Sequence, residues 1–249
     1  MITTWARVTC LAACVCAVSS AQSARTPVVI ELFTSEGCSS CPPADRLLAR
    51  LENEQPVPEA DILVMEEHVD YWDHLGWRDP FSAASYTQRQ QEYALAFGSE
   101  DEYTPEMVVD GRPGFTGSDG RRALELIRDS AAAPHATVDI RREGDSKIGI
   151  SAGHFPAGTK SVDVVLAITE DALGNNVLRG ENAGRRLSHA AVARSLVSLG
   201  QFDARKSPEY HAELPLRVMP EWNRQNLRVI AFVQDRSSHR ILGAAGLRP

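Results

Sequence analysis

Two cysteines three positions apart, Cys38 and Cys41, stand in the string Cys-Ser-Ser-Cys and can cycle between a dithiol and a disulfide. The other three cysteines of the chain, Cys10, Cys14 and Cys16, lie within the first 24 residues. Once that segment is set aside, no other thiol of the chain can pair with Cys38 or Cys41. Exchange needs an attacking thiolate and a second cysteine that resolves the mixed disulfide. We expect Cys38, the more exposed of the two, to attack and Cys41, in the first turn of a helix, to resolve.

A second group of reactive side chains follows an apolar run at residues 62–65. His68, Asp70, Tyr71 and Trp72 lie in the string HVDYWDHLGW, which combines imidazoles and carboxylates with aromatic rings. The side chains of this segment can line one side of a substrate site beside the cysteines, where His68 or Asp70 would transfer protons. Alternatively, the aromatic side chains cover the core while the acids cap the next helix. The sequence leaves both interpretations open, because nearness to the cysteines rests on fold analogy.

The cysteine pair separates two segments with different periodicity. Residues 28–33 are nearly all apolar, as in a strand that is covered on both faces of a sheet. After the pair, Ala44, Leu47, Leu48 and Leu51 form one apolar helical face. The unpaired N–H groups and the dipole at the start of this helix favour a negatively charged sulfur.

Further elements extend this pattern to residue 133. They are a buried strand at 62–65, a helix that opens at Asp79 and runs to about residue 97, a hairpin at 107–116, and a helix capped by Ser118 or Asp119. The resulting β-α-β-α-β-β-α order is that of thioredoxin. Thr104-Pro105 stands just before the third strand, where thioredoxin-like proteins carry a cis-proline opposite the C-x-x-C pair. The cis form of an X-Pro bond costs only about 0.5–1 kcal/mol. We expect Thr104 and Pro105 to position a bound partner.

Four strings make the likeness more specific: ELFTSEGCSSCPPAD, HVDYWDHLGWRDPF, YTPEMVVDG and GSDGRRAL. Together they resemble the secreted thioredoxin-like family catalogued as domain of unknown function 1223, over nearly all of the chain that follows the leader. The resemblance implies a thioredoxin-like fold and brings no established substrate. Thioredoxins carry a buried acid six residues before the first cysteine, but Leu32 stands there in this chain. Glu31, one position earlier, should point to the opposite face of the strand, so the proton-transfer residue is unassigned.

Residues 1–24 have the pattern of a cleaved secretory signal. Arg7 precedes an apolar stretch at 8–18, and small residues follow it. That stretch is shorter than the roughly 20 residues that span a bilayer, so we expect no membrane span. We expect a periplasmic or secreted protein. The string at 11–14 also resembles a bacterial lipoprotein cleavage site, although it would leave an unusually short signal.

Beyond the alanines at 131–133, the pattern changes to short β-like runs separated by Gly, Asn, Asp and Ser. We therefore expect a thioredoxin-like domain at 25–133, followed by a small all-β sandwich-like domain at 134–249. The second part holds no cysteine and no recognisable catalytic set. Within it, residues 175–189 can form either a binding loop near the first domain or a plain polar connection.

Three alternatives to thiol exchange are open. A static disulfide is one, although closing so short a loop contributes only roughly 2 kcal/mol in the chain-entropy model. A Cu or Zn site is another, with Cys38 and Cys41 joined by His68 or His74, although no second C-x-x-C supports it. The third is a noncatalytic binding module on a thioredoxin-like scaffold.

The charge of the chain bears on which classes of molecule it can bind. The formal net charge is −7, and Lys and Arg form no run, which predicts no nucleic-acid partner. The expected partner is a protein or small-molecule thiol or disulfide client. We expect no cofactor, and we assign no residue to a metal.

Overall fold

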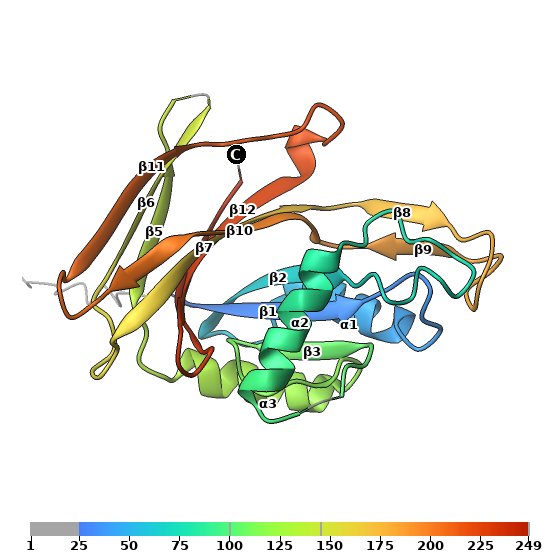
Figure 1. Cartoon of the computed structure of the whole chain (residues 1–249), viewed down its shortest axis with the longest axis horizontal. Coiled ribbons are helices and arrows are strands. Elements are labelled where there is room, and N and C mark those ends of the chain that lie inside the picture. Colours follow the sequence, from blue (N-terminus) through green and yellow to red (C-terminus); the bar gives the residue numbers. More distant parts are fainter. Residues whose placement is uncertain (1–24, 100, 145, 249) are drawn as a thin grey trace, which may run out of the picture.

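The computed structural model describes residues 25–248 except 100 and 145, so the expected leader lies outside the described residues. In chain order the elements are β1 (Thr26–Thr34), α1 (Pro42–Glu54), β2 (Ala60–His68), α2 (Ala84–Ala96), β3 (Glu106–Val109), β4 (Phe115–Thr116), α3 (Gly120–Ala131), β5 (Thr137–Arg142), β6 (Lys147–Gly153), β7 (Ser161–Glu170), β8 (Leu173–Asn176), β9 (Arg186–His189), β10 (Val192–Asp203), β11 (Glu209–Pro215), the 3-10 turn η1 (Arg224–Asn226), β12 (Leu227–Asp235) and β13 (Ile241–Leu247). The protein therefore has a mixed α/β fold with a large central sheet and three helices in the described part (Figure 1).

The elements from β1 to α3 follow the expected β-α-β-α-β-β-α order. β1 pairs in parallel with β2 and antiparallel with β3, and β4 pairs antiparallel with β3. One face of this sheet buries Leu32 against Leu48 of α1 and Ile127 of α3. The opposite face buries Phe33 against Tyr93 of α2. The alternating side chains of β1 thus fill two separate cores, which explains its nearly continuous apolar sequence.

Two helices begin as their sequences predict. α1 starts directly after Cys41 with two prolines, at positions whose N–H groups would have no partner within the helix. Asp119 caps α3, and its side chain accepts a hydrogen bond from the backbone N–H of Arg122 at 3.0 Å. Among the described residues, no helix has both the length and the apolar character that a membrane crossing requires.

The expected start of α2 at Asp79 is wrong. The helix begins at Ala84, and its N-cap residue makes no side-chain hydrogen bond. The Asp79 carboxylate instead faces the imidazole of His68 at 2.7 Å and accepts a hydrogen bond from the backbone N–H of Glu36 at 2.8 Å. The other carboxylate oxygen accepts a hydrogen bond from the backbone N–H of Phe81 at 2.9 Å, so Asp79 binds the cysteine turn and its own loop instead of capping a helix.

The central sheet continues past the expected boundary at residues 133 and 134. Its eight strands have the order β13-β12-β7-β10-β2-β1-β3-β4, and β10 joins β2 in parallel through Val192 and Glu66. Leu63 of β2 is buried with Val165 of β7 and Phe232 of β12. The small all-β sandwich-like domain expected over 134–249 therefore shares the central sheet with residues 25–133. Four of its strands extend the first sheet, because the outer edge of β2 and its apolar side chains need cover.

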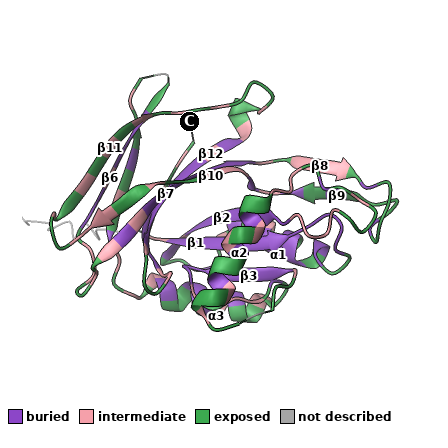
Figure 2. Cartoon of the chain, in the orientation of Figure 1, coloured by how far each residue is buried: buried purple, intermediate pink, exposed green. Residues whose placement is uncertain are grey.

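A smaller sheet lies over the far end of the central one. It has the order β11-β6-β5, and Ile140 and Ile150 from it are buried with Val164 and Val229 of the central sheet. This end of the molecule thus has the two packed layers of a sandwich. In Figure 2 the strands β1, β2 and β12 are mostly buried, whereas β11 is largely exposed or half-buried. β8 and β9 form a separate hairpin, which lies at the same end of the molecule as the start of α1 (Figure 1).

Candidate functional site

Cys38 and Cys41 form a disulfide at the turn between β1 and α1, with their Cα atoms 5.4 Å apart. Cys41 is the N-cap residue of α1, and its carbonyl oxygen accepts hydrogen bonds from the backbone N–H groups of Ala44 and Asp45. The disulfide therefore lies at the helix end whose dipole stabilises a negative charge. A thiolate formed here on reduction gains from that field.

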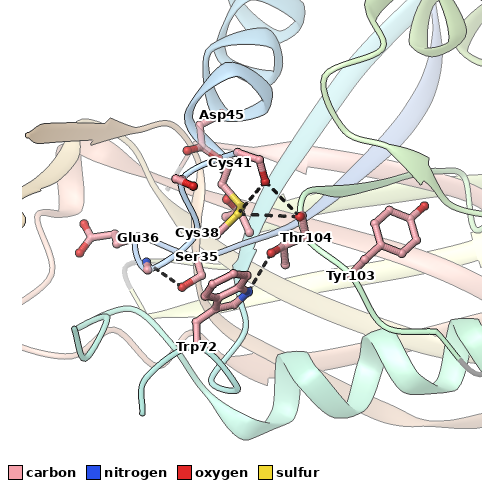
Figure 3. Close-up of a disulfide and its surroundings, with 12 residues drawn as sticks. Ser35, Glu36, Cys38, Cys41, Asp45, Trp72, Tyr103 and Thr104 are labelled. Carbon is pink, nitrogen blue, oxygen red and sulfur yellow. Dashed lines mark hydrogen bonds between the residues drawn. A yellow bond between two sulfur atoms is a disulfide. The ribbon is translucent and has the colours of Figure 1, made fainter. Parts of the chain in front are cut away.

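The Thr104–Pro105 peptide bond lies opposite the disulfide and is cis, as expected. Cys38 Sγ is 3.8 Å from the carbonyl oxygen of Thr104 (Figure 3). The hydroxyl of Ser40 lies 3.3 Å from the same sulfur and 3.4 Å from the same carbonyl oxygen. A disulfide sulfur has no proton to donate, so the contact between Cys38 and Thr104 becomes a hydrogen bond only when Cys38 is a thiol.

Both cysteines are buried, with 0% of each residue exposed. The expectation that Cys38 is the more exposed cysteine is therefore wrong. Only Ser39 and Ser40 of this turn reach solvent. A partner can reach Cys38 only after the groups that cover the sulfur move.

The loop between β8 and β9 covers the cysteine turn. The side-chain amide of Asn182 is fully buried and donates hydrogen bonds to the carbonyl oxygens of Glu36 and Cys38, both at 2.9 Å. Glu181 accepts a hydrogen bond from the backbone N–H of Ser39 at 3.0 Å. The stretch at 175–189 thus lies against the cysteine turn, so its role is more than that of a plain polar connection.

Trp72 also reaches the site. Its indole N–H donates to the hydroxyl of Thr104 at 2.8 Å (Figure 3). A Cβ atom on Gly37 would lie 3.1 Å from Trp72 Cβ, so the absent side chain allows this close approach. Tyr71 points instead toward α2, where its hydroxyl donates to Gln90 at 3.2 Å, and burial raises the pKa of Tyr71.

His68 and Asp70 do not join Trp72 beside the disulfide. Asp70 accepts a hydrogen bond from the Thr87 hydroxyl at 2.6 Å, which ties the end of β2 to α2. Asp70 therefore does not cap α2, whose N-cap residue makes no side-chain hydrogen bond. His68 is fully buried on the α1 side of the sheet, where it belongs to a cluster of ionisable groups.

This cluster, hereafter the buried histidine cluster, consists of Glu36, Glu66, His68, Asp79 and His189, all buried. His189 Nε2 is 3.2 Å from Glu36 Oε1, and His189 Nδ1 is 3.0 Å from Glu66 Oε2. His68 Nε2 is 3.6 Å from the same Glu66 oxygen, and His68 Nδ1 faces Asp79. The cluster therefore joins the cysteine turn, the end of β2 and the end of β9.

The charges of the cluster depend on one another. Burial opposes a charge on His68, but Asp79 and Glu66 raise its pKa well above the usual value. Burial likewise opposes a charge on His189, whose pKa rises to about 9 because Glu36 and Glu66 lie beside it. For Glu66 and Asp79, the neighbouring imidazoles outweigh burial and lower the pKa. The imidazoles and these two carboxyl groups therefore stabilise one another's charged forms.

A further buried acid, Asp45, follows Cys41 by one helical turn. The two residues lie side by side at the start of α1 (Figure 3), and Asp45 accepts a hydrogen bond from the Thr34 hydroxyl at 2.7 Å. Burial, together with the charge of Glu66, raises the pKa of Asp45 to about 7. Leu32 is part of the apolar core between the sheet and α1. The acid near the cysteines thus comes from the helix instead of the strand.

Glu31 faces away from the disulfide, as the strand alternation predicts. Its carboxylate pairs with Arg89 and accepts a hydrogen bond from the Tyr93 hydroxyl at 2.6 Å, on the α2 side of the sheet. Glu67 shares this second buried group, and burial together with the charge of Glu31 raises the pKa of Glu67.

Sequence reasoning missed four buried ionisable residues: Asp45 and, in the buried histidine cluster, Glu36, Glu66 and His189. One local signal was present, because Glu66 and His68 share a face of a strand that is otherwise buried and apolar. His189 carries no such signal, since its partners are more than a hundred residues away.

Comparison with known proteins identifies the family but supplies no activity. The chain is similar to a crystal structure of Protein AGR_C_4864 from Agrobacterium tumefaciens, with 28% identity over 90% of this chain and 94% of that chain, and a TM-score of 0.69. A domain of the outer membrane lipoprotein Omp28 from Porphyromonas gingivalis is 11% identical over 46% of this chain and 85% of that chain, with a TM-score of only 0.26. No curated protein matches the chain. Residues 29–234 match a family described as "Protein of unknown function (DUF1223)", and the chain therefore belongs to that family.

Proposed function

We propose that this protein is an exported thiol-disulfide oxidoreductase with a thioredoxin-like fold, which acts through Cys38 and Cys41. The observation that carries the proposal is the disulfide at the start of α1, with Cys38 Sγ 3.8 Å from the Thr104 carbonyl oxygen. The β2-β1-β3-β4 pairing with α1 and α3 on one face supports the thioredoxin-like fold. The signal-like pattern of residues 1–24 supports a periplasmic or secreted location.

The proposed exchange conserves atoms and electrons. In the reduced protein the Cys38 thiolate attacks one sulfur of a client disulfide, and the other client sulfur leaves as a thiolate. Cys41 then loses its proton and attacks Cys38 Sγ, which re-forms the intramolecular disulfide and releases the second client thiolate. The client gains two electrons and the protein loses two. The same steps run backwards when the client is a dithiol, and the reduction potentials of the two couples set the direction.

Thr104 and Pro105 are placed to position the client. The Thr104 hydroxyl is held by Trp72, and its carbonyl oxygen faces Cys38. In this proposal, these contacts fix the turn against which the client main chain lies during attack. Asp45 is the buried carboxyl group beside Cys41, and its pKa of about 7 suits a group that takes the Cys41 proton and returns it.

The test is to trap the mixed disulfide. A Cys41→Ser variant, produced in an exporting host, lacks the resolving thiol, so Cys38 should remain joined to its client. We expect adducts that disappear on reduction and are absent from the Cys38→Ser/Cys41→Ser control. A lack of Cys38-dependent adducts, under conditions that trap a known oxidoreductase, would refute the exchange and leave the disulfide a structural staple.

A further inference from the structure

Three side-chain atoms of the buried histidine cluster converge on one point. Glu66 Oε2 lies 3.0 Å from His189 Nδ1 and 3.6 Å from His68 Nε2, and all three atoms lie within 4.8 Å of one another. All three side chains are fully buried. Within the described part of the chain, none of these three atoms has a hydrogen-bond partner of good geometry. Buried polar atoms without such partners are rare in proteins, and an ion bound to all three atoms would satisfy them together.

The opposite nitrogen of each imidazole is held by a carboxylate. His68 Nδ1 lies 2.7 Å from Asp79 Oδ2, and His189 Nε2 lies 3.2 Å from Glu36 Oε1. A carboxylate in this place keeps the proton on the nitrogen that it faces. The other nitrogen can then offer its lone pair toward Glu66. Histidines that bind metals in proteins are oriented by carboxylates in this way.

The spacing suits a small ion with nitrogen and oxygen ligands. Bonds of about 2.0–2.1 Å in a tetrahedral arrangement place neighbouring ligand atoms about 3.3 Å apart. The separations of 3.0 and 3.6 Å lie on either side of that value. Two imidazoles and one carboxylate form a ligand set of zinc and of other divalent transition metals, whereas calcium and magnesium prefer oxygen ligands alone.

We propose that Glu66, His68 and His189 form a site for one divalent transition-metal ion, for which Zn(II) is the test ion. The ion would bind His68 Nε2, His189 Nδ1 and Glu66 Oε2, the three atoms that face one another. Each imidazole keeps the proton that faces Asp79 or Glu36.

This site is separate from a thiolate site. The ligands are nitrogen and oxygen atoms of β2 and β9, while both cysteine sulfurs are joined to each other. Metal binding is therefore expected in the oxidised protein, and it does not depend on the proposed exchange activity.

The first experiment measures zinc binding by the oxidised protein. The protein is purified without a polyhistidine tag, stripped with a chelator, and titrated with Zn(II) against a chromophoric competitor. We expect one ion per chain. His189→Gln and His68→Gln each remove a ligand and should lower the zinc affinity on the order of a hundredfold or more. Glu36→Gln removes only the carboxylate that orients His189, so it should lower the affinity about 10–100-fold. His135→Gln, which alters another half-buried histidine that faces a carboxylate, and Cys38→Ser/Cys41→Ser should keep the affinity.

The second experiment needs no variant, so it holds even if the substitutions prevent folding. X-ray absorption of the zinc-loaded wild-type protein should show two imidazoles and only nitrogen or oxygen in the first shell. The proposal is overturned if the wild-type protein binds no zinc, if sulfur is present in the shell, or if the double serine variant loses the ion.

Discussion

The side-chain nitrogen of Asn182 lies 2.9 Å from the carbonyl oxygen of Cys38, although 144 residues separate them in the chain. The same amide group also binds the carbonyl oxygen of Glu36. The loop between β8 and β9 is thereby fastened over a disulfide that has no exposed surface. The backbone of the cysteine turn is thus held by a segment that lies far beyond the C-x-x-C pair in the sequence.

We predict that Asn182→Ala will expose the disulfide. Each lost hydrogen bond contributes about 1 kcal/mol to the closed arrangement, so opening should become at least about fivefold more frequent. The rate of disulfide reduction by dithiothreitol should rise by a similar factor. Asn176→Ala, an exposed position on the same hairpin, is the matched control. Equal reduction rates in the two variants would show that the loop does not limit access.

We predict that Asp45→Asn will flatten the pH dependence of stability. The unfolded carboxyl group ionises near 3.8, whereas burial raises the pKa in the folded protein to about 7. The folded state holds this proton more tightly, so the stabilisation is fully present below the lower value and is lost as the pH rises through the upper one. The free energy of unfolding of the variant should therefore fall less than that of the wild type across this window.

The measurement for Asp45 is urea unfolding of the oxidised protein at several pH values between about 4 and about 7. Asp129→Asn, an exposed acid in α3, is the control and should keep the pH dependence of the wild type. The prediction fails if the wild-type and Asp45→Asn curves run parallel.

We predict that His189→Gln will destabilise the metal-free protein. Removing one partner of a buried ion pair costs about 3–5 kcal/mol, here because Glu36 and Glu66 lose their shared cation. The pKa of His189 is raised from 6.5 to about 9, so its contribution is complete below the lower value and is lost as the pH rises through the upper one. Urea unfolding with a chelator present, at neutral pH and above about pH 9, measures both effects.

The control for His189 is His211→Gln, because His211 is an exposed imidazole that lies 3.1 Å from Glu209. An exposed pair contributes at most about 1 kcal/mol. If both substitutions cost the same, the buried histidine cluster does not stabilise the fold.

We predict that residues 25–133 will not fold cooperatively alone. The truncation would bare the edge of β2 and the apolar side chains of Val29, Leu63 and Met65, which are buried against β7, β12 and β13. The fragment should bind a hydrophobic dye and unfold without a sharp transition, whereas residues 25–249 should unfold cooperatively. A sharp transition in the fragment would instead establish residues 25–133 as an independent domain.

The sequence by itself determined the local features of this protein. It placed the cysteine pair between a buried strand and a helix, and it predicted the seven-element order, a cap at Ser118 or Asp119 and the cis bond before Pro105. It also predicted that Glu31 turns away from the disulfide. Most of these follow from residue types and periodicity within one element or from its immediate flanks, whereas the cis bond was expected from the likeness to the thioredoxin order.

Only the tertiary structure decided which side chains meet. The burial of Cys38, the clamp by Asn182 and the convergence of His189 with Glu66 all depend on the β8–β9 hairpin reaching the cysteine turn. That placement follows from the parallel pairing of β10 with β2, between strands that lie more than a hundred residues apart. Periodicity shows which face of an element is buried, but it does not show against which distant element that face packs.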